Sequence, residues 1–269
     1  MLTWIAALSG LTGNPTIKHM TMRIQVVTLF PSLIQDALSY GVISRAQDMG
    51  LAEIGYINPR DYTADRHRTV DDRPYGGGPG MVLKPEPVSA AIKAAGDALG
   101  GDARVVHLSP QGKRLDQQAV TRLSQLPGLV LIAGRYEGID ERVIGQMVDE
   151  EYSLGDYVLT GGELAVAVLV DAMIRLLPGA LGDERSAEQD SFVAGLLDCA
   201  HYTRPEVFAG EQVPQVLLSG DHEAIRRWRL KQALGRTWLR RPDLLDNIRL
   251  DEEQQELLAE FQSEHGINE

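Results

Sequence analysis

Short apolar runs alternate with segments of helical periodicity along the first two thirds of the chain. The run at residues 24–30 is aliphatic and β-branched and ends at Pro31, so it predicts a first strand. The same reasoning predicts strands at residues 54–57, 104–108, 129–133 and 157–159, and helices at residues 32–40, 87–99, 116–126, 141–148 and 163–177. This alternation favours an α/β fold in which helices cover both faces of a parallel sheet.

One long segment interrupts the pattern. Residues 58–84 are dense in charge, glycine and proline and show no periodicity. A loop of this length inside a compact domain is usually functional or disordered, and we expect one or the other here. The glycine cluster at residues 76–80 could bend the backbone around an anion or act as a mobile hinge, but no Lys-Ser/Thr pair follows it, so it is not a nucleotide P-loop.

The pattern also predicts the domain organisation. A first domain is expected at residues 22–181, followed by a small, polar linker at residues 182–190. Residues 191–269 lack strand alternation and predict a smaller, mostly helical second domain. Residues 1–21 begin apolar but lack the preceding positive charge of a secretory signal, so we expect a flexible extension there.

Composition narrows the functional classes. The chain has 269 residues, compatible with two domains of ~150 residues each. No apolar run approaches the ~20 residues that cross a bilayer, so we expect no membrane partner. The formal net charge of −12 argues against a protein that coats nucleic acid in general. The one cysteine, Cys199, excludes an internal disulfide and is expected to be a small buried apolar residue of a cytoplasmic protein.

The net charge hides a local basic block. Residues 222–242 hold seven basic side chains against Glu223 alone, interleaved with Trp228 and Trp238, whereas residues 243–269 are strongly acidic. Such a block is typical of a surface that binds a phosphate backbone. A solvated helix face whose charges pair with the acidic tail explains the same pattern equally well.

Three turn-rich segments, at residues 109–112, 134–138 and 155–162, follow or adjoin predicted strands. Ligands of parallel α/β sheets bind where strands pass into loops at their carboxyl ends, and glycine allows the backbone to approach a ligand closely. The three loops could therefore pool main-chain hydrogen bonds around an adenine-like base. Each one taken alone is also compatible with an ordinary tight turn.

Longer strings of residues point to a family. RHRTVDDRPYGGGPGM at residues 66–81, LSPQG at 108–112, GRYEGIDER at 134–142 and GDYVL at 155–159 closely resemble the bacterial tRNA (guanine-N1)-methyltransferases. DSF at residues 190–192, LDC at 197–199, HYTRP at 201–205 and RRWR at 226–229 match the same family. The resemblance extends in order, without large gaps, from Met22 to beyond Leu258.

The resemblance implies a function and a fold. Members of the family use S-adenosyl-L-methionine to methylate N1 of the tRNA guanosine immediately 3′ of the anticodon (position 37), with Mg²⁺ supporting the transfer. Their fold is a knotted (SPOUT-class) α/β methyltransferase with a deep trefoil knot, and their active site lies between the two subunits of a homodimer. The expected partners are thus tRNA and a second copy of the chain, and not DNA. The residue pattern alone would not predict a knot, because threaded connections are nearly absent from known folds.

The resemblance also assigns roles residue by residue. It implies that Asp190 is the general base and Arg175 its supporting cation, and that tRNA is bound by Asp71, Arg226, Arg227 and Arg229. The cofactor residues that it implies are Leu108, Ser109, Pro110, Gln111, Gly134, Tyr136, Glu137, Gly138, Leu154, Gly155, Tyr157, Leu159, Gly161 and Gly162.

Two positions depart from the family pattern and bear on the fine geometry of the pocket. Ala165 stands where relatives often carry proline, and His107 stands where tyrosine is common. His67 and His201 are expected to be structural or RNA-contacting side chains. No cluster of histidines and carboxylates has the spacing of a transition-metal site, so a metal would be magnesium held together with the substrate.

The chemistry makes sense of the two catalytic assignments. Guanine N1 carries a proton that a carboxylate within hydrogen-bond reach can accept, and a guanidinium stabilises the negative charge that then spreads onto O6. Without the resemblance, Asp190 would be interpreted as a helix N-cap and Arg175 as a favourable charge at a helix C-terminus. Two further hypotheses stay open: an RNA-binding module without catalysis, and a related methyltransferase of ribosomal RNA.

Overall fold

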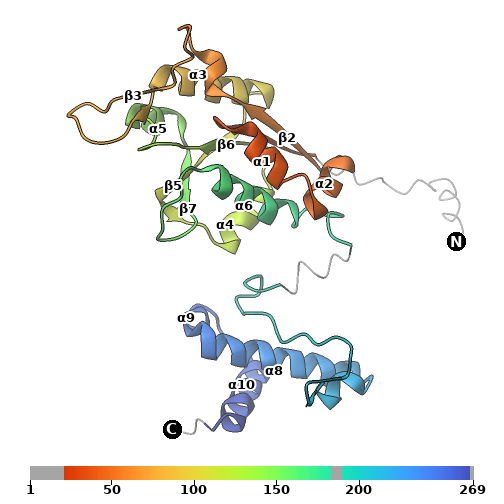
Figure 1. Ribbon diagram of the computed structural model, residues 1–269. Helices are drawn as coiled ribbons and strands as arrows, with labels where there is room; N and C mark the ends of the chain where they lie inside the picture. The colour runs from red at the N-terminus through yellow and green to blue at the C-terminus, as the bar shows by residue number, and fades with distance from the viewer. Residues whose placement is uncertain (1–20, 183–189, 267–269) are drawn as a thin grey trace, which may run out of the picture.

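The computed structural model describes residues 21–182 and 190–266. Five parallel strands form the central sheet in the order β2 (Ala52–Ile57), β1 (Met22–Val27), β6 (Gly128–Ala133), β5 (Arg104–Arg114) and β7 (Glu150–Ser153) (Figure 1). The predicted parallel sheet is therefore confirmed. The expected extension at residues 1–21 and linker at residues 182–190 lie outside the described residues, apart from Thr21, Gly182 and Asp190.

The middle strand, β6, shows why the sheet is covered on both faces. All six of its residues are buried, and they alternate between two apolar clusters: Leu129 and Leu131 in one, Val130 and Ile132 in the other. The first cluster contains α6 (Glu163–Ile174) with α1 (Pro31–Ala37), α2 (Gly41–Asp48) and α4 (Gln117–Ser124). The second contains α3 (Pro85–Ala98) and α5 (Glu141–Met147) on the opposite face (Figure 1).

The helix expected at residues 32–40 is confirmed but shorter, and a second helix that the sequence pattern did not predict follows it. α1 ends at Ala37, and a second helix, α2, begins at Gly41. Gly41 has a φ of 65°, a left-handed conformation that turns the chain between the two helices and that glycine adopts without strain.

The strand predicted at residues 157–159 is wrong. The strand that pairs with β5 at this edge is β7 instead, and Tyr157 and Val158 are exposed loop residues. The two glutamates of β7 break the apolar pattern by which a strand is recognised in the sequence. They are tolerated because β7 is an edge strand. Glu150 is stabilised there by Arg122, whose guanidinium donates to it at 2.5 and 3.1 Å.

Strand β5 is longer than predicted and irregular. Its register against β7 shifts between Leu108 and Lys113, both of which pair with Tyr152, so residues 109–112 bulge out of the ladder. At the end of this bulge a side chain on Gly112 would overlap the backbone of Tyr152. Glycine is therefore what allows the chain to return to its partner strand.

The loop at residues 58–84 is anchored rather than free at its carboxyl end. It contains the 3₁₀ turn η1 (Pro59–Tyr62) and a small antiparallel pair, β3 (Asp71–Asp72) with β4 (Val82–Leu83). The amides of Leu83 and Glu137 donate to the carbonyls of Gly138 and Met81 at 2.9 Å. The loop is thereby tied to residues 134–138.

The carboxyl-terminal part is less helical than predicted, because residues 191–221 are largely irregular. They contain the hairpin β8 (Val207–Phe208) and β9 (Glu211–Gln212) and the 3₁₀ turn η2 (Gln215–Leu218). The helices follow: α8 (His222–Arg240), α9 (Pro242–Leu245) and α10 (Glu252–Glu264).

Helices α8 and α10 cross closely. A side chain on Gly235 would overlap the ring of Phe261, and Leu234 and Leu257 belong to the small apolar cluster between the helices. Asp221 caps α8, and Asp251 and Gln254 form a capping box at the start of α10, so the sequence itself fixes both helix starts. None of the helices in the described part of the chain is long and apolar enough to cross a membrane.

Candidate functional site

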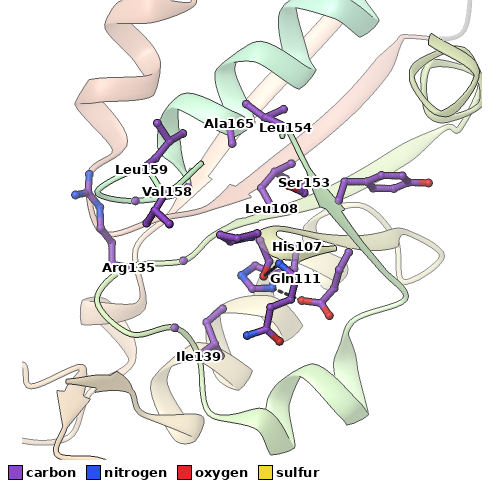
Figure 2. Close-up of a pocket in the computed structure, with 18 of the residues that line it drawn as sticks. His107, Leu108, Gln111, Arg135, Ile139, Ser153, Leu154, Val158, Leu159 and Ala165 are labelled. Carbon is purple, nitrogen blue, oxygen red and sulfur yellow. Dashed lines mark hydrogen bonds and ion pairs between the residues drawn. The ribbon is translucent and has the colours of Figure 1, made fainter. Parts of the chain in front are cut away.

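A cavity of about 380 Å³ lies where the irregular segments after the strand ladders of β5, β6 and β7 meet. Every residue that the resemblance assigns to the cofactor contributes to its lining. In Figure 2 the apolar side chains of Leu154, Leu159 and Ala165 gather at one end, whereas His107 and Gln111 lie toward the other. The cavity thus combines an apolar end with polar groups and exposed backbone.

Backbone contacts fix two of the cavity loops to one another. The amide of Gly162 donates to the carbonyl of Gly134 at 2.8 Å, and Arg135 and Gly161 form an isolated antiparallel bridge. A Cβ atom on Gly162 would lie 2.9 Å from Cα of Ala133 and from the amide nitrogen of Gly134. Since this approach is too close for any side chain, glycine at position 162 brings the two loops together.

A buried charge pair lies beneath the same loops. Arg135 Nε is 2.8 Å from Oε2 of Glu163, which is 1% exposed, although the N–H is not aligned for a hydrogen bond. The other carboxylate oxygen accepts from Thr28 Oγ1 at 3.0 Å, and the guanidinium stacks 4.5 Å from the ring centre of Phe30. These contacts tie the loop after β6 to the start of α6 and the end of β1.

His107 is the buried titratable group of the cavity. It is 6% exposed, and its Nδ1 lies 2.8 Å from Glu151 Oε1 (Figure 2). Burial lowers the pKa of His107, and the nearby carboxylates of Glu151 and Glu141 oppose this shift. A neutral ring that donates from Nδ1 leaves Nε2 as an acceptor. A Cβ atom on Gly134 would lie 3.1 Å from that nitrogen.

The loop at residues 134–138 holds Tyr136 and Glu137 in constrained positions. Tyr136 has a φ of 60° and is 49% exposed, so a bulky residue adopts a left-handed conformation at the cavity rim. The carboxylate of Glu137 packs against Gly80, where a side chain would overlap it. Such strain is often found where a side chain must be presented to a ligand.

Arg175 and Asp190 are brought together, but away from the cavity. Arg175 caps the carboxyl end of α6, and its Nη2 donates to Asp190 Oδ2. Both side chains are about 40% exposed, and neither lines the cavity, to which the opposite end of α6 contributes Gly162 and Ala165. A helix rises ~1.5 Å per residue, so the pair is separated from the cavity by roughly the length of α6.

Comparison with known proteins decides the family. The profile of the family described as tRNA (Guanine-1)-methyltransferase TrmD matches residues 22–247. The chain belongs to this family. It is 62% identical over 246 residues to the tRNA (guanine-N(1)-)-methyltransferase of Methylococcus capsulatus, covering 91% of this chain and 98% of the relative. It is 60% identical over 243 residues to the protein of that name from Tolumonas auensis, covering 90% and 98%.

The residues that the TrmD resemblance assigns to tRNA have different surroundings. Asp71 begins the short strand β3 and is half-buried beside Leu83. Arg226 and Arg227 both donate to Glu253 of α10, at 2.5 and 2.8 Å. Arg229 is exposed and lines a separate cleft.

One group of metal-binding side chains occurs in the described residues. Asp198, Cys199 and His201 offer ligand atoms within 4.8 Å of one another, a spacing that the sequence analysis overlooked. Asp198 Oδ2 already bonds His201 Nε2 at 2.7 Å, and burial together with the Asp198 charge raises the pKa of the Cys199 thiol. Thiol and imidazole do not suit Mg²⁺, which prefers oxygen ligands, so this group is not a magnesium site.

Sequence reasoning missed two side-chain pairs at the cavity: Arg135 with Glu163, and His107 with Glu151. Each pair joins distant parts of the chain. Glu163 directly follows the glycine pair at the start of a predicted helix and could have been singled out as an acidic residue in an otherwise apolar segment. His107 was noted only as a departure from the family pattern.

Proposed function

We propose that this protein transfers the methyl group of S-adenosyl-L-methionine to N1 of the tRNA guanosine immediately 3′ of the anticodon, at position 37. The observation that carries the proposal is the gathering of all the family's cofactor positions in one cavity at the sheet edge. The names of relatives about 60% identical, tRNA (guanine-N(1)-)-methyltransferase, support it. The same reasoning favours the cytoplasm, where tRNA is modified.

The cavity fits such a cofactor. Its 380 Å³ is within the range of ~300–1,000 Å³ that is usual for small-ligand sites. Other backbone groups of the loops that line the cavity could bond an adenine edge, and Leu154 and Leu159 offer apolar contact to its faces. The bound cofactor supplies a methyl group already activated by a sulfonium.

The proposal extends to the domain organisation and to the path of the chain. We assign residues 22–181 to the methyltransferase domain, 182–190 to a linker and 191–269 to a tRNA-binding domain, after a flexible extension at residues 1–21. A trefoil knot is proposed around the cavity. The contacts that support it join the loop after β6 to the segment before α6, as expected where one threads past the other.

A second copy of the chain would complete the site. Within one chain the Arg175–Asp190 pair and the cavity are at opposite ends of α6. We propose a homodimer in which the pair of one subunit faces the cavity of the other. Such an arrangement brings a base and a cation to the methyl donor without moving either end of the helix.

In the proposed reaction Asp190 accepts the proton of guanine N1, and Arg175 donates to O6 as negative charge develops there. The N1–C bond forms as the S–CH₃ bond breaks, and the proton remains on Asp190. In the described chain the two side chains bond each other. The guanine therefore has to separate them, which makes the base available only when substrate is present.

Magnesium is kept as a cofactor held with the substrate. The described residues contain no preformed group of three carboxylates, since Asp198, Cys199 and His201 are the one group of His, Cys, Asp and Glu side chains found. Substrate oxygens would have to supply the remaining ligands, so no step of the reaction above depends on the ion.

The test is transfer of labelled methyl groups to a tRNA transcript with guanosine 37, beside transcripts with another base there and ribosomal RNA. Product digestion and mass spectrometry should find 1-methylguanosine in the first transcript alone. Methylation of ribosomal RNA instead would favour the related methyltransferase. Binding of tRNA without transfer would favour the non-catalytic RNA-binding module.

A further inference from the structure

The basic residues of α8 divide into two sets. Arg226, Arg227 and Lys231 face the acidic helix α10: both arginines donate to Glu253, and Lys231 donates to Glu264 at 2.7 Å. Arg226 also bonds Glu223 at 2.8 and 3.0 Å. Their charge is therefore largely balanced within the protein. Of the two alternatives that the sequence left open for the basic block, ion pairing with the acidic tail applies to these three residues.

Arg229 belongs to the other set. It is exposed, and no acidic side chain within residues 21–182 and 190–266 forms an ion pair with it. It lies at a cleft of about 470 Å³ between α8 and the irregular segment that precedes it. Arg204, also exposed and without an ion pair among the same residues, lines the same cleft.

Aromatic and apolar side chains also line the cleft. Tyr202 is 50% exposed, and its ring centre is 6.2 Å from that of Trp228, with a tilt of 57°. Leu217 and Ile225 contribute apolar surface to the lining. The two guanidinium groups outnumber Glu206, the one carboxylate in the lining. A flat ring beside an excess of guanidinium groups is the combination that binds single-stranded nucleic acid, where bases stack on aromatic side chains and phosphates bond cations.

We propose that this cleft, the Tyr202–Arg229 cleft, binds one unstacked nucleotide of the tRNA. The base stacks on Tyr202, and Arg229 bonds the adjacent phosphate. The inference rests on the proposed function, because it takes tRNA as the substrate. It narrows the expectation for the basic block: Arg229 contributes to RNA affinity, whereas Arg226 mainly stabilises the contact with α10.

The first experiment compares Arg229→Ala with Arg226→Ala, which removes the same side chain from the same helix. Affinity for a tRNA transcript is measured in the full-length protein across potassium chloride concentrations. We expect Arg229→Ala to weaken binding about 5- to 10-fold and to reduce the slope of log K against log salt by about 0.7–0.9, as for one lost phosphate contact. Arg226→Ala should change affinity less than about 2-fold. Equal effects of the two variants would overturn the assignment.

The second experiment finds the nucleotide. Transcripts with a single abasic site at each anticodon-loop position are bound by the wild type, Tyr202→Ala and Tyr202→Phe. One abasic position should weaken the wild type and Tyr202→Phe about 10-fold, a stacking-sized effect, but leave Tyr202→Ala little changed. Tyr202 is half-exposed, so both variants should fold, which circular dichroism would check.

The outcomes separate this inference from the proposed function. Methylation of guanosine 37 together with uniform, Tyr202-independent abasic effects would overturn the cleft and leave the enzyme assignment in place. A single abasic position that weakens tRNA binding by the wild type and by Tyr202→Phe, but not by Tyr202→Ala, supports the cleft. A wild type that neither binds nor methylates tRNA would overturn both.

Discussion

The cavity proposed to hold the cofactor and the Tyr202–Arg229 cleft are built in contrasting ways. The cavity is formed by loops that backbone hydrogen bonds and a buried ion pair hold in place, over a sheet with an apolar cluster on each face. The cleft is lined by exposed and half-exposed side chains of α8 and of the irregular segment before it. A small ligand benefits from a preorganised pocket, whereas a large polyanion can bind to side chains that adapt.

Substitutions should therefore act differently in the cavity loops and near the cleft. Close packing of the cavity loops leaves no space for added atoms, so changes there should act on ligand affinity through the backbone. Charges near the cleft are solvated and individually weak, so changes there should act in small steps that depend on salt.

Replacing the proposed base should have the largest effect. We expect Asp190→Ala to reduce methyl transfer by about 10²–10⁴-fold, because the proton of guanine N1 then has no acceptor. Cofactor affinity should be nearly unchanged, since Asp190 does not line the cavity. Single-turnover transfer to tRNA and calorimetric titration of the cofactor would measure the two. An unchanged rate would remove Asp190 as the base.

Breaking the buried ion pair should destabilise the first domain. Glu163→Ala leaves the Arg135 guanidinium, whose side chain is 18% exposed, without its carboxylate and should lower the free energy of unfolding by about 3–5 kcal/mol. Urea denaturation measures the change. Glu53→Ala is the control, because the Arg23–Glu53 pair is exposed and should contribute less than about 1 kcal/mol. Equal losses would mean that the buried pair has no special role.

Adding one methyl group should test the packing of the cavity loops. Gly162→Ala places a Cβ 2.9 Å from the backbone of Ala133 and Gly134, so we expect at least a ~10-fold loss of cofactor affinity from displaced loops. Gly145→Ala, in α5 with no atom within 4 Å of the added Cβ, should bind normally and gain up to ~1 kcal/mol of stability. Normal binding by Gly162→Ala would show that the loops adapt.

Acid should weaken the fold through His107. Its pKa is lowered mainly by burial, so between that value and the ordinary ~6.5 the unfolded chain binds more protons than the folded one. This contribution to stability is complete above pH ~6.5 and is lost as the pH falls through the folded-state pKa.

The measurement compares urea denaturation of the wild type and His107→Phe from pH 7.5 to 5.5. The variant should lose less stability over this window, by up to about 1 kcal/mol, because it has no buried imidazole to protonate. Parallel pH profiles would assign the acid sensitivity to other groups.

The parts of the fold that the sequence predicted well share one property. Strands β1, β5 and β6 and helices α3 to α6 have local apolar patterns that match their burial. Strand β7 does not, because Glu150 and Glu151 satisfy their charges through Arg122 and His107, which lie far away in sequence. Periodicity cannot detect a strand whose polar residues are compensated by tertiary contacts.

The site was predictable to the same extent. Glycine-rich loops at strand ends indicated a ligand cavity, and the family resemblance named its residues. Which arginines of α8 remain available could not be predicted, since it depends on the direction in which α10 crosses that helix. The position of Arg175 relative to the cavity likewise follows from the length of α6 and not from the identity of the residue.

The acidic helix α10 has a consequence for how a nucleic acid approaches. By neutralising one side of α8, in a chain of net charge −12, it surrounds the remaining cations with a repulsive field. We expect polyanions to be repelled in most orientations before contact, so that productive encounters are those aligned with the unpaired arginines of the cleft. Selectivity among the many RNAs of a cell would then begin at long range, ahead of any recognition of bases.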